Sequence, residues 1–229
     1  MSVVAGVPLP FPQRGALEPS RTALLVIDMQ RDFCAENGYM HRLGVDLERL
    51  KQPVEPIRRV LGAARRCGLT IMHTREGYAP DLSDLQPWKV GGAANEAIGS
   101  TGPLGRALVR GEEGWNIIDE LAPSPSEDVF DKASYGVFAT TAIDADFRAR
   151  DIRAAILVGL TTDCCVTSTL REALDRGIEC VVVEDCTAAA SQRRHDAAID
   201  LIRSSGGVFG TLAKSDDVIE ALGTAHRER

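Results

Sequence analysis

Two adjacent cysteines, Cys164 and Cys165, stand where an apolar run of strand length gives way to a helical pattern. The run breaks at Gly159 into small polar residues just before the pair. A thiol in the first turn of a helix lies near unpaired backbone N–H groups and the positive end of the helix dipole, which stabilise thiolate over thiol. The pattern therefore favours a nucleophilic cysteine at neutral pH. The alternative is a structural cysteine that packs as a small hydrophobic side chain.

Charged side chains also stand at the ends of other strand-like runs, namely Asp28, Arg75, Glu76 and Lys132. The carboxyl ends of parallel strands share one edge of a sheet, and ligands bind at that edge. An aspartate, a lysine and a cysteine in one crevice supply a base, a cation and a nucleophile. Each of them alone has a simpler explanation, because strand ends are solvated and often charged.

Strand-like and helix-like segments alternate along the chain. Runs rich in Val, Ile and Leu are typical of strands covered on both faces, and they predict strands at 22–28, 69–75, 128–132, 154–159, 179–185 and 207–210. Amphipathic patterns predict helices at 53–67, 141–150, 164–176, 191–204 and 214–222. The alternation predicts an α/β fold, a three-layer doubly wound sheet of about six mostly parallel strands with helices on both faces.

The length of 229 residues fits a single domain over 1–229. Prolines interrupt residues 1–16, which we expect to form an extended N-terminal arm without a signal peptide or membrane span. Residues 78–114 are rich in Gly and Pro and have weak periodicity. A connection of that length predicts a functional loop, either a lid or a segment that meets a neighbouring subunit.

The net charge of −7 and the scattered basic residues argue against nucleic acid and membranes as partners. A small, uncharged or cationic ligand is easier to accommodate. The six cysteines show no metal-type Cys-x-x-Cys pair, and the chain is too long for a scaffold held by disulfides. We therefore expect reduced cysteines and a cytoplasmic protein.

Three segments of this chain resemble the signature segments of the isochorismatase-like cysteine hydrolases. They are residues 26–33 (VIDMQRDF), 131–132 (DK) and 159–166 (GLTTDCCV). The resemblance runs in order from about residue 17 to residue 222. Residues 73–77 (HTREG) and 80–85 (PDLSDL) look like the branch that acts on ureido compounds, especially the biuret and triuret hydrolases.

The resemblance implies a catalytic triad of Asp28, Lys132 and Cys165, with Cys164 packed beside it. It also implies a cis peptide bond between Leu160 and Thr161, and an oxyanion hole formed by the backbone N–H groups of Thr161 and Cys165. Asp28 would accept the thiol proton, and Cys165 would attack an amide-type carbonyl to give a thioester that water hydrolyses. With biuret the products would be allophanate and ammonia. The resemblance implies no cofactor and a homo-oligomer, most simply a tetramer.

Six residues on or beside these segments are the candidates for substrate binding: Phe33, Arg75, Glu76, Tyr135, Phe138 and Ser205. Glu76 can accept a hydrogen bond from the NH2 terminus of a planar ureide while aromatic walls exclude water. The alternative for Phe33 and Phe138 is a role in the core alone. Departures from the biuret-hydrolase pattern at 132–138 and 204–206 leave triuret or another carbamoyl compound open.

Four alternative functions remain at this point. Some relatives hold a metal with aspartate and histidines, but the four histidines here lack ligand spacing, so we predict no metal. Isochorismatases that cleave a vinyl ether lack the cysteine that is present here. An amidohydrolase for ureidoacrylate or an N-carbamoyl amino acid is a further alternative. A catalytically silent binding module of the same fold is the last, and the intact Asp28, Lys132 and Cys165 argue against it.

Overall fold

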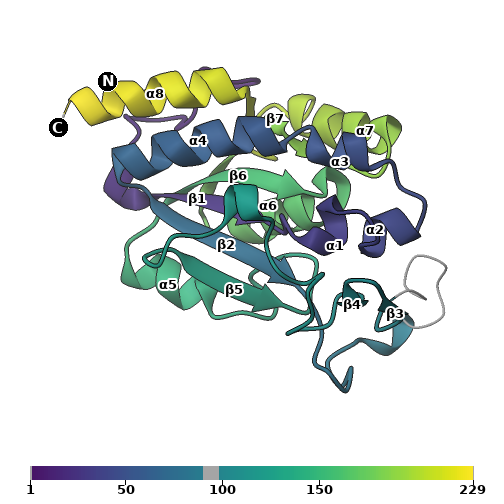
Figure 1. Cartoon of the computed structure of the whole chain (residues 1–229). Coiled ribbons are helices and arrows are strands. Elements are labelled where there is room, and N and C mark those ends of the chain that lie inside the picture. Colours follow the sequence, from purple (N-terminus) through teal and green to yellow (C-terminus); the bar gives the residue numbers. More distant parts are fainter. Residues whose placement is uncertain (1, 90–97, 229) are drawn as a thin grey trace.

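The computed structural model describes residues 2–89 and 98–228. Its centre is a sheet in the order β5-β2-β1-β6-β7-β8, with every neighbouring pair parallel (Figure 1). The strands are β1 (Thr22–Ile27), β2 (Thr70–Glu76), β5 (Asp128–Lys132), β6 (Ala154–Leu160), β7 (Glu179–Ala188) and β8 (Thr211–Ala213). The expected doubly wound α/β sheet of six strands is confirmed.

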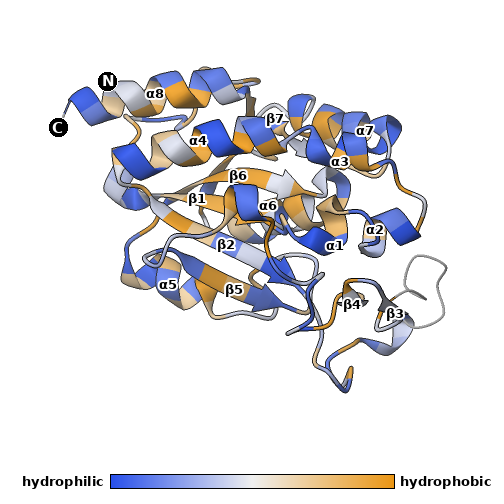
Figure 2. Cartoon of the chain, in the orientation of Figure 1, coloured by the Kyte–Doolittle hydropathy of each residue, from blue (hydrophilic) through white to orange (hydrophobic). Residues whose placement is uncertain are grey.

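Helices cover both faces of this sheet. The helices are α1 (Arg31–Cys34), α2 (Tyr39–Arg42), α3 (Leu47–Lys51), α4 (Val54–Cys67), α5 (Ile143–Ala149), α6 (Thr167–Leu174), α7 (Gln192–Arg203) and α8 (Ser215–Arg227). Alternate residues of one strand face opposite layers, so Leu24 and Val26 pack with α4 and α8, whereas Leu25 packs with α5, α6 and α7. In Figure 2 the central strands are therefore largely apolar along their length, while the helices carry polar residues as well.

The predicted strand at 207–210 is wrong, because the last strand begins at Thr211. Gly207 and Gly210 both have positive φ angles, 93° and 84°, so these residues form a turn that leads into β8. The helix predicted from Cys164 also differs. A single turn of π-helix, Thr162–Val166, carries both cysteines, and α6 follows it.

Residues 78–89 and 98–114, the described parts of the long connection, lie at the carboxyl edge of the sheet and have little regular structure. The described part contains the short helix η2 (Pro87–Lys89) and the hairpin of β3 (Thr101–Gly102) and β4 (Gly105–Arg106). The buried Asp32 ties it to α2, since its carboxylate accepts from the backbone N–H groups of Leu108 (2.8 Å) and Tyr39 (3.1 Å). The segment is thus held close to the strand ends.

The N-terminal residues lie against the edge strand. Val7 forms an antiparallel bridge with Leu212 of β8, and Val4 pairs with Phe11. The side chains of Val4 and Phe11 are fully buried. Among the described residues, the helices are all too short or too polar to cross a bilayer.

Glu127 joins three elements at the opposite, amino end of β5. Its carboxylate accepts two hydrogen bonds from Arg65 of α4 (2.7 and 2.9 Å), one from the N–H of Ser124 (2.9 Å), and contacts His73 Nε2 of β2 at 3.0 Å. Burial alone would raise the pKa of Glu127, but these hydrogen bonds and the charge of Arg65 outweigh it and hold the pKa at about 2.

A folded-state pKa below the ordinary 4.5 means that ionised Glu127 stabilises the fold above pH 4.5, and that this stabilisation is lost as the pH falls towards about 2. We predict that Glu127→Gln lowers the free energy of unfolding at pH 7 by about 2 kcal/mol. Urea unfolding at several pH values should show the difference from wild type shrinking below pH 4.5. Glu55→Gln, which removes an exposed partner of Arg58, should change the free energy of unfolding far less than Glu127→Gln does. A constant difference from pH 7 to pH 3 would contradict this origin of the stability.

Candidate active site

Asp28 and Lys132 form a fully buried ion pair at the carboxyl edge of the sheet. Asp28 follows β1 with a φ of 51°, a conformation that aspartate tolerates better than most residues. Its Oδ1 accepts from Thr74 Oγ1 of β2 at 2.6 Å, and its Oδ2 lies 2.7 Å from Lys132 Nζ. Both side chains have no exposed surface. The carboxylate is therefore fixed by two neighbouring strands.

The register of the sheet brings Glu76 into the same group. Glu76 of β2 pairs with Lys132 of β5, and its Oε2 lies 3.9 Å from the lysine Nζ. Although burial favours the neutral amine, the nearby Asp28, Cys165 and Glu76 raise the pKa of Lys132 above its ordinary value. Lys132 is thus a buried cation that both carboxylates share.

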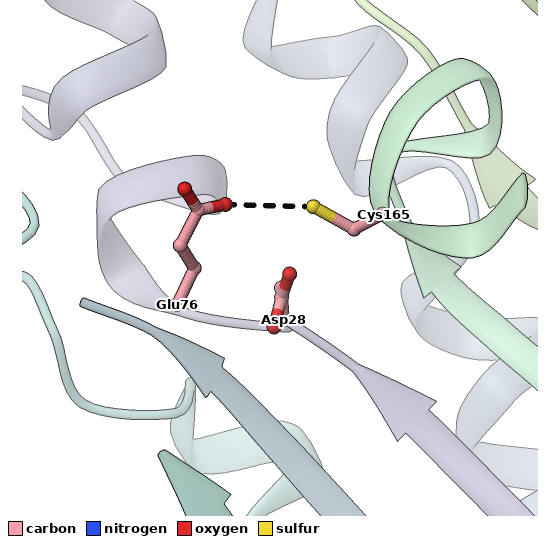
Figure 3. Close-up of side chains that lie close together, drawn as sticks. All are labelled: Asp28, Glu76 and Cys165. Carbon is pink, nitrogen blue, oxygen red and sulfur yellow. Dashed lines mark hydrogen bonds between the residues drawn. The ribbon is translucent and has the colours of Figure 1, made fainter. Parts of the chain in front are cut away.

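Cys165 faces these residues from the turn after β6. Its Sγ donates to Glu76 Oε2 at 3.4 Å, and the two side chains point toward each other with Asp28 beside them (Figure 3). The sulfur and one carboxylate oxygen of each acid lie within 4.8 Å of one another. The sulfur is therefore surrounded by two carboxylates, with the Lys132 ammonium close by.

Backbone and side-chain hydrogen bonds hold the turn that carries the sulfur. The O of Thr161 accepts from the N–H groups of Cys164 and Val166, both at 3.1 Å. Thr162 Oγ1 contacts His195 Nδ1 of α7 at 2.9 Å. The Leu160–Thr161 peptide bond is cis, as the resemblance implies. The nucleophile thus stands on a turn fixed from two sides.

The protonation of Cys165 differs from the simplest expectation. A hydrogen bond with Cys164 and burial raise the pKa of the Cys165 thiol, Lys132 lowers it, and the two carboxylates raise it further. The net pKa lies well above the ordinary value. The helix-start argument, which favours thiolate, is therefore outweighed. The resting residue is a thiol, and the proton must leave as the sulfur attacks.

Glu76 contacts the reacting sulfur directly. Its side chain is buried, and its Oε1 accepts from Tyr78 Oη at 3.1 Å. The side-chain amide of Gln30 accepts from the backbone N–H of Glu76 at 2.7 Å and donates to its backbone O at 2.9 Å. The carboxylate is accordingly held in one orientation, with its second oxygen toward Cys165.

Two of the candidate binding residues lie away from this group. Arg75 alternates with Glu76 along β2 and points to the other face, where it pairs with Asp131 at 2.7 and 3.2 Å and stacks on Trp115 at 3.5 Å. Ser205 lies in the turn after α7, at the amino edge of the sheet, where its hydroxyl donates to the O of Ile202 and accepts from the N–H of Phe209.

The three aromatic candidates divide between core and site. Phe33 and Phe138 are buried and pack edge-on against Tyr39 and Phe147, at 6.3 and 5.5 Å between ring centroids, which favours the core alternative for both. Tyr135 is 38% exposed and stands beside the active site. Its ring faces a lysine ammonium at 4.1 Å.

That ammonium belongs to Lys89, which the sequence did not indicate, and Tyr78 was likewise missed as a site residue. Lys89 is 2% exposed and lies 4.0 Å from Glu76 Oε1. The available signal was that Lys89 is the sole lysine of the segment 78–114, which already stood out as a functional loop.

Asp28, Glu76 and Cys165 offer three atoms that could hold a metal ion. In this protein the Lys132 ammonium lies 2.7 Å from Asp28 and 3.9 Å from Glu76, so a buried cation already stands beside both carboxylates. A divalent ion would have to displace this buried lysine. The two carboxylates and the thiol therefore suit the ammonium of Lys132 better than a metal ion.

Comparison of the sequence with known proteins finds a matching family and similar proteins. Residues 22–214 match the isochorismatase domain family. The chain is 31% identical over 222 residues to the ureidoacrylate amidohydrolase RutB of Acinetobacter baylyi, covering 92% of this chain and 87% of that protein.

Two solved structures share the fold. A cysteine hydrolase from Pseudomonas syringae pv. phaseolicola superposes with a TM-score of 0.78 at 25% identity, covering 93% of this chain and 97% of that one. The N-carbamoylsarcosine amidase of Thermoplasma acidophilum gives a TM-score of 0.66 at 29% identity, with coverage of 86% and 97%. The expected family is confirmed: the chain belongs to the isochorismatase family and is a hydrolase.

Proposed function

We propose that this protein is a cysteine-dependent amidohydrolase that cleaves a terminal C–N bond of a small ureido compound. The observation that carries the proposal is the Cys165 thiol, held against Glu76 and close to the Asp28–Lys132 ion pair. The names of the relatives, an amidohydrolase of ureidoacrylate and an amidase of N-carbamoylsarcosine, support this bond type.

The reaction begins when the substrate replaces the resting hydrogen bond. An NH2 group of the ureide donates to Glu76 and takes the place of the thiol, whose proton then passes to Asp28, within 4.8 Å. The sulfur forms a bond to the carbonyl carbon as the oxygen becomes an oxyanion against the N–H groups of Thr161 and Cys165. Lys132 offsets the charge of the carboxylates throughout.

Breakdown of this intermediate returns the proton. Asp28 protonates the departing nitrogen, the C–N bond breaks, and ammonia leaves a thioester on Cys165. Water then gives a proton to Asp28 and attacks the thioester carbon, and the C–S bond breaks as the thiol is restored. With biuret the products are allophanate and ammonia.

The charges around the sulfur favour a neutral substrate. Asp28 and Glu76 bring two negative charges, and the buried Lys132 and Lys89 bring two positive ones. Arg75 is engaged by Asp131 on the other face. A carboxylated substrate would therefore place an unbalanced charge among buried groups, which is costly. We accordingly propose biuret or triuret as the substrate.

The second candidate is ureidoacrylate, because the curated relatives at about 31% identity carry that substrate in their name. It shares the terminal carbamoyl group, so the same nucleophile could attack it. It differs in its carboxylate, which makes the two candidates separable by experiment.

Replacement of the nucleophile should abolish turnover but leave the fold. We predict that Cys165→Ser reduces kcat/KM on the order of a thousandfold or more, because the hydroxyl is far less ionised than the thiol. Cys164→Ala is the matched control and should retain activity within about threefold. Ammonia release by both variants measures this. An active Cys165→Ser together with an inactive Cys164→Ala would assign the nucleophile to the other cysteine.

The substrate is tested by ammonia release across biuret, triuret, ureidoacrylate and an N-carbamoyl amino acid. We predict the highest kcat/KM for biuret or triuret. Glu76→Gln should lower that value at least about tenfold, equivalent to ~1.4 kcal/mol, because the amide presents donors to the substrate NH2 and to the thiol. A clear preference for a carboxylated compound would defeat the neutral-substrate proposal and leave the amidohydrolase proposal standing.

We also propose that the protein is a homo-oligomer, most simply a tetramer, in which residues 78–114 meet a neighbouring subunit. The large apolar side chain of Trp88, in this segment, is 73% exposed, which is costly on a free surface. Sedimentation at micromolar concentration should give a mass well above the 24.6 kDa of one chain. A monomeric mass would contradict the proposal, and a smaller assembly with Trp88→Glu would locate the contact.

A further inference from the structure

Lys89 is a buried lysine that the reaction described above does not use. It lies on η2 (Pro87–Lys89) and has 2% of its surface exposed. Its Nζ donates to Tyr78 Oη at 2.5 Å and to the O of Ala133 at 3.5 Å. The ammonium also faces the ring of Tyr135 at 4.1 Å. A lysine is seldom this buried unless it is paired, so its partner is informative.

The charged partner of Lys89 is Glu76. Lys89 Nζ lies 4.0 Å from Glu76 Oε1, and Tyr78 Oη bridges the two by accepting from the lysine and donating to the same oxygen at 3.1 Å. The other oxygen of Glu76, Oε2, accepts from Cys165 Sγ. The carboxylate thus has one oxygen directed to Lys89 and the other to the reacting sulfur.

A thiolate at Cys165 requires this balance. Each nearby carboxylate disfavours a negative sulfur, and each nearby ammonium favours it. Lys132 carries a single positive charge and lies 2.7 Å from Asp28 and 3.9 Å from Glu76, so this one cation faces two carboxylates. Without a second cation the thiol would have to ionise beside one uncompensated carboxylate charge.

We propose that Lys89 is the counter-ion of Glu76, as Lys132 is the counter-ion of Asp28, and that it acts as a positioning residue that permits Cys165 to ionise. Residues 78–89 then supply part of the active site through Tyr78 and Lys89, and the reactivity of the sulfur depends on their position beside Glu76. The effect of Lys89 on catalysis rests on the proposed function. Its effect on the ionisation of Cys165 does not.

The pH response of Cys165 reflects all the ionisable groups that face it. They come from the ends of β1, β2 and β5, from η2, from the loops after β2 and β5, and from the turn itself: Asp28, Glu76, Lys132, Lys89, Tyr78, Tyr135 and Cys164. Only a comparison that changes one charge at a time isolates the part of Lys89.

The test is the rate at which iodoacetamide alkylates Cys165 between pH 5 and 10, measured by mass spectrometry of the peptide in a Cys164→Ala background. We expect Lys89→Met to slow alkylation about tenfold at pH 7 and by a similar factor across this pH range, because a cation that favours thiolate is lost. The double variant Lys89→Met/Glu76→Gln keeps the charge balance and should return to within about threefold of the background.

Lys51→Met is the matched control. It removes an exposed lysine and should leave the rate unchanged within about twofold. If Lys89→Met does not fold, Lys89→Gln serves the same comparison. An unchanged alkylation rate in the single variant would overturn the proposal. A double variant as slow as the single one would also overturn it, because a merely structural role of Lys89 is not relieved by removal of a carboxylate.

This experiment is independent of the substrate. If the enzyme hydrolyses ureides but Lys89→Met does not slow alkylation, the role of Lys89 is overturned and the proposed function stands. If Lys89→Met slows alkylation but the enzyme hydrolyses none of the ureides, the proposed function is overturned and the role of Lys89 stands.

Discussion

The active site depends on one buried ion pair, Asp28 with Lys132. Taking two charges out of water is expensive, and the attraction between them offsets this cost only when the geometry is good and the remaining polar atoms are bonded. The two charges are 2.7 Å apart, Thr74 Oγ1 donates to the other carboxylate oxygen, and Lys132 Nζ donates to the O of Ser134. Parallel strands make this possible, because they bring the ends of β1, β2 and β5 to one edge. Loss of either partner would leave a buried charge beside the nucleophile.

Much of the fold follows from local pattern. The central strands β1 and β6 are continuous apolar runs, and their burial on both faces is what such runs require. The short helices α1, α2 and α3 were not predicted, because four or five residues carry almost no periodic signal. Contacts distant in sequence support them, such as the Asp32 carboxylate that bonds to Tyr39 and Leu108. β8 was misplaced because three residues are too few to distinguish a strand from the turn before it.

The site was partly predictable for the same reason. Asp28, Lys132 and Cys165 lie at or just beyond the carboxyl ends of β1, β5 and β6, so the topology brings them to the same edge. Arg75 and Glu76 could not be separated by sequence, because one residue of register decides which face a strand side chain takes. Ser205 precedes a strand and so lies at the amino edge. Lys89 comes from a segment without periodicity, and nothing local shows that a lysine there is buried against a carboxylate 13 residues away in the chain.

The state of the sulfur shows how magnitudes decide between opposing effects. A helix N-terminus contributes about 0.3–1 kcal/mol to a nearby anion, which is less than one pKa unit. Full burial can shift a pKa by about 3–5 units, and two carboxylates add to that shift. The hydrogen bond with Cys164 and burial therefore prevail over the helix start, and the resting Cys165 is a thiol bonded to Glu76. Such a residue is a weak nucleophile until a donor replaces it at Glu76 and the proton moves to Asp28. The buried charges thus couple the nucleophile to occupancy of the site, which an exposed thiolate at a helix start could not do.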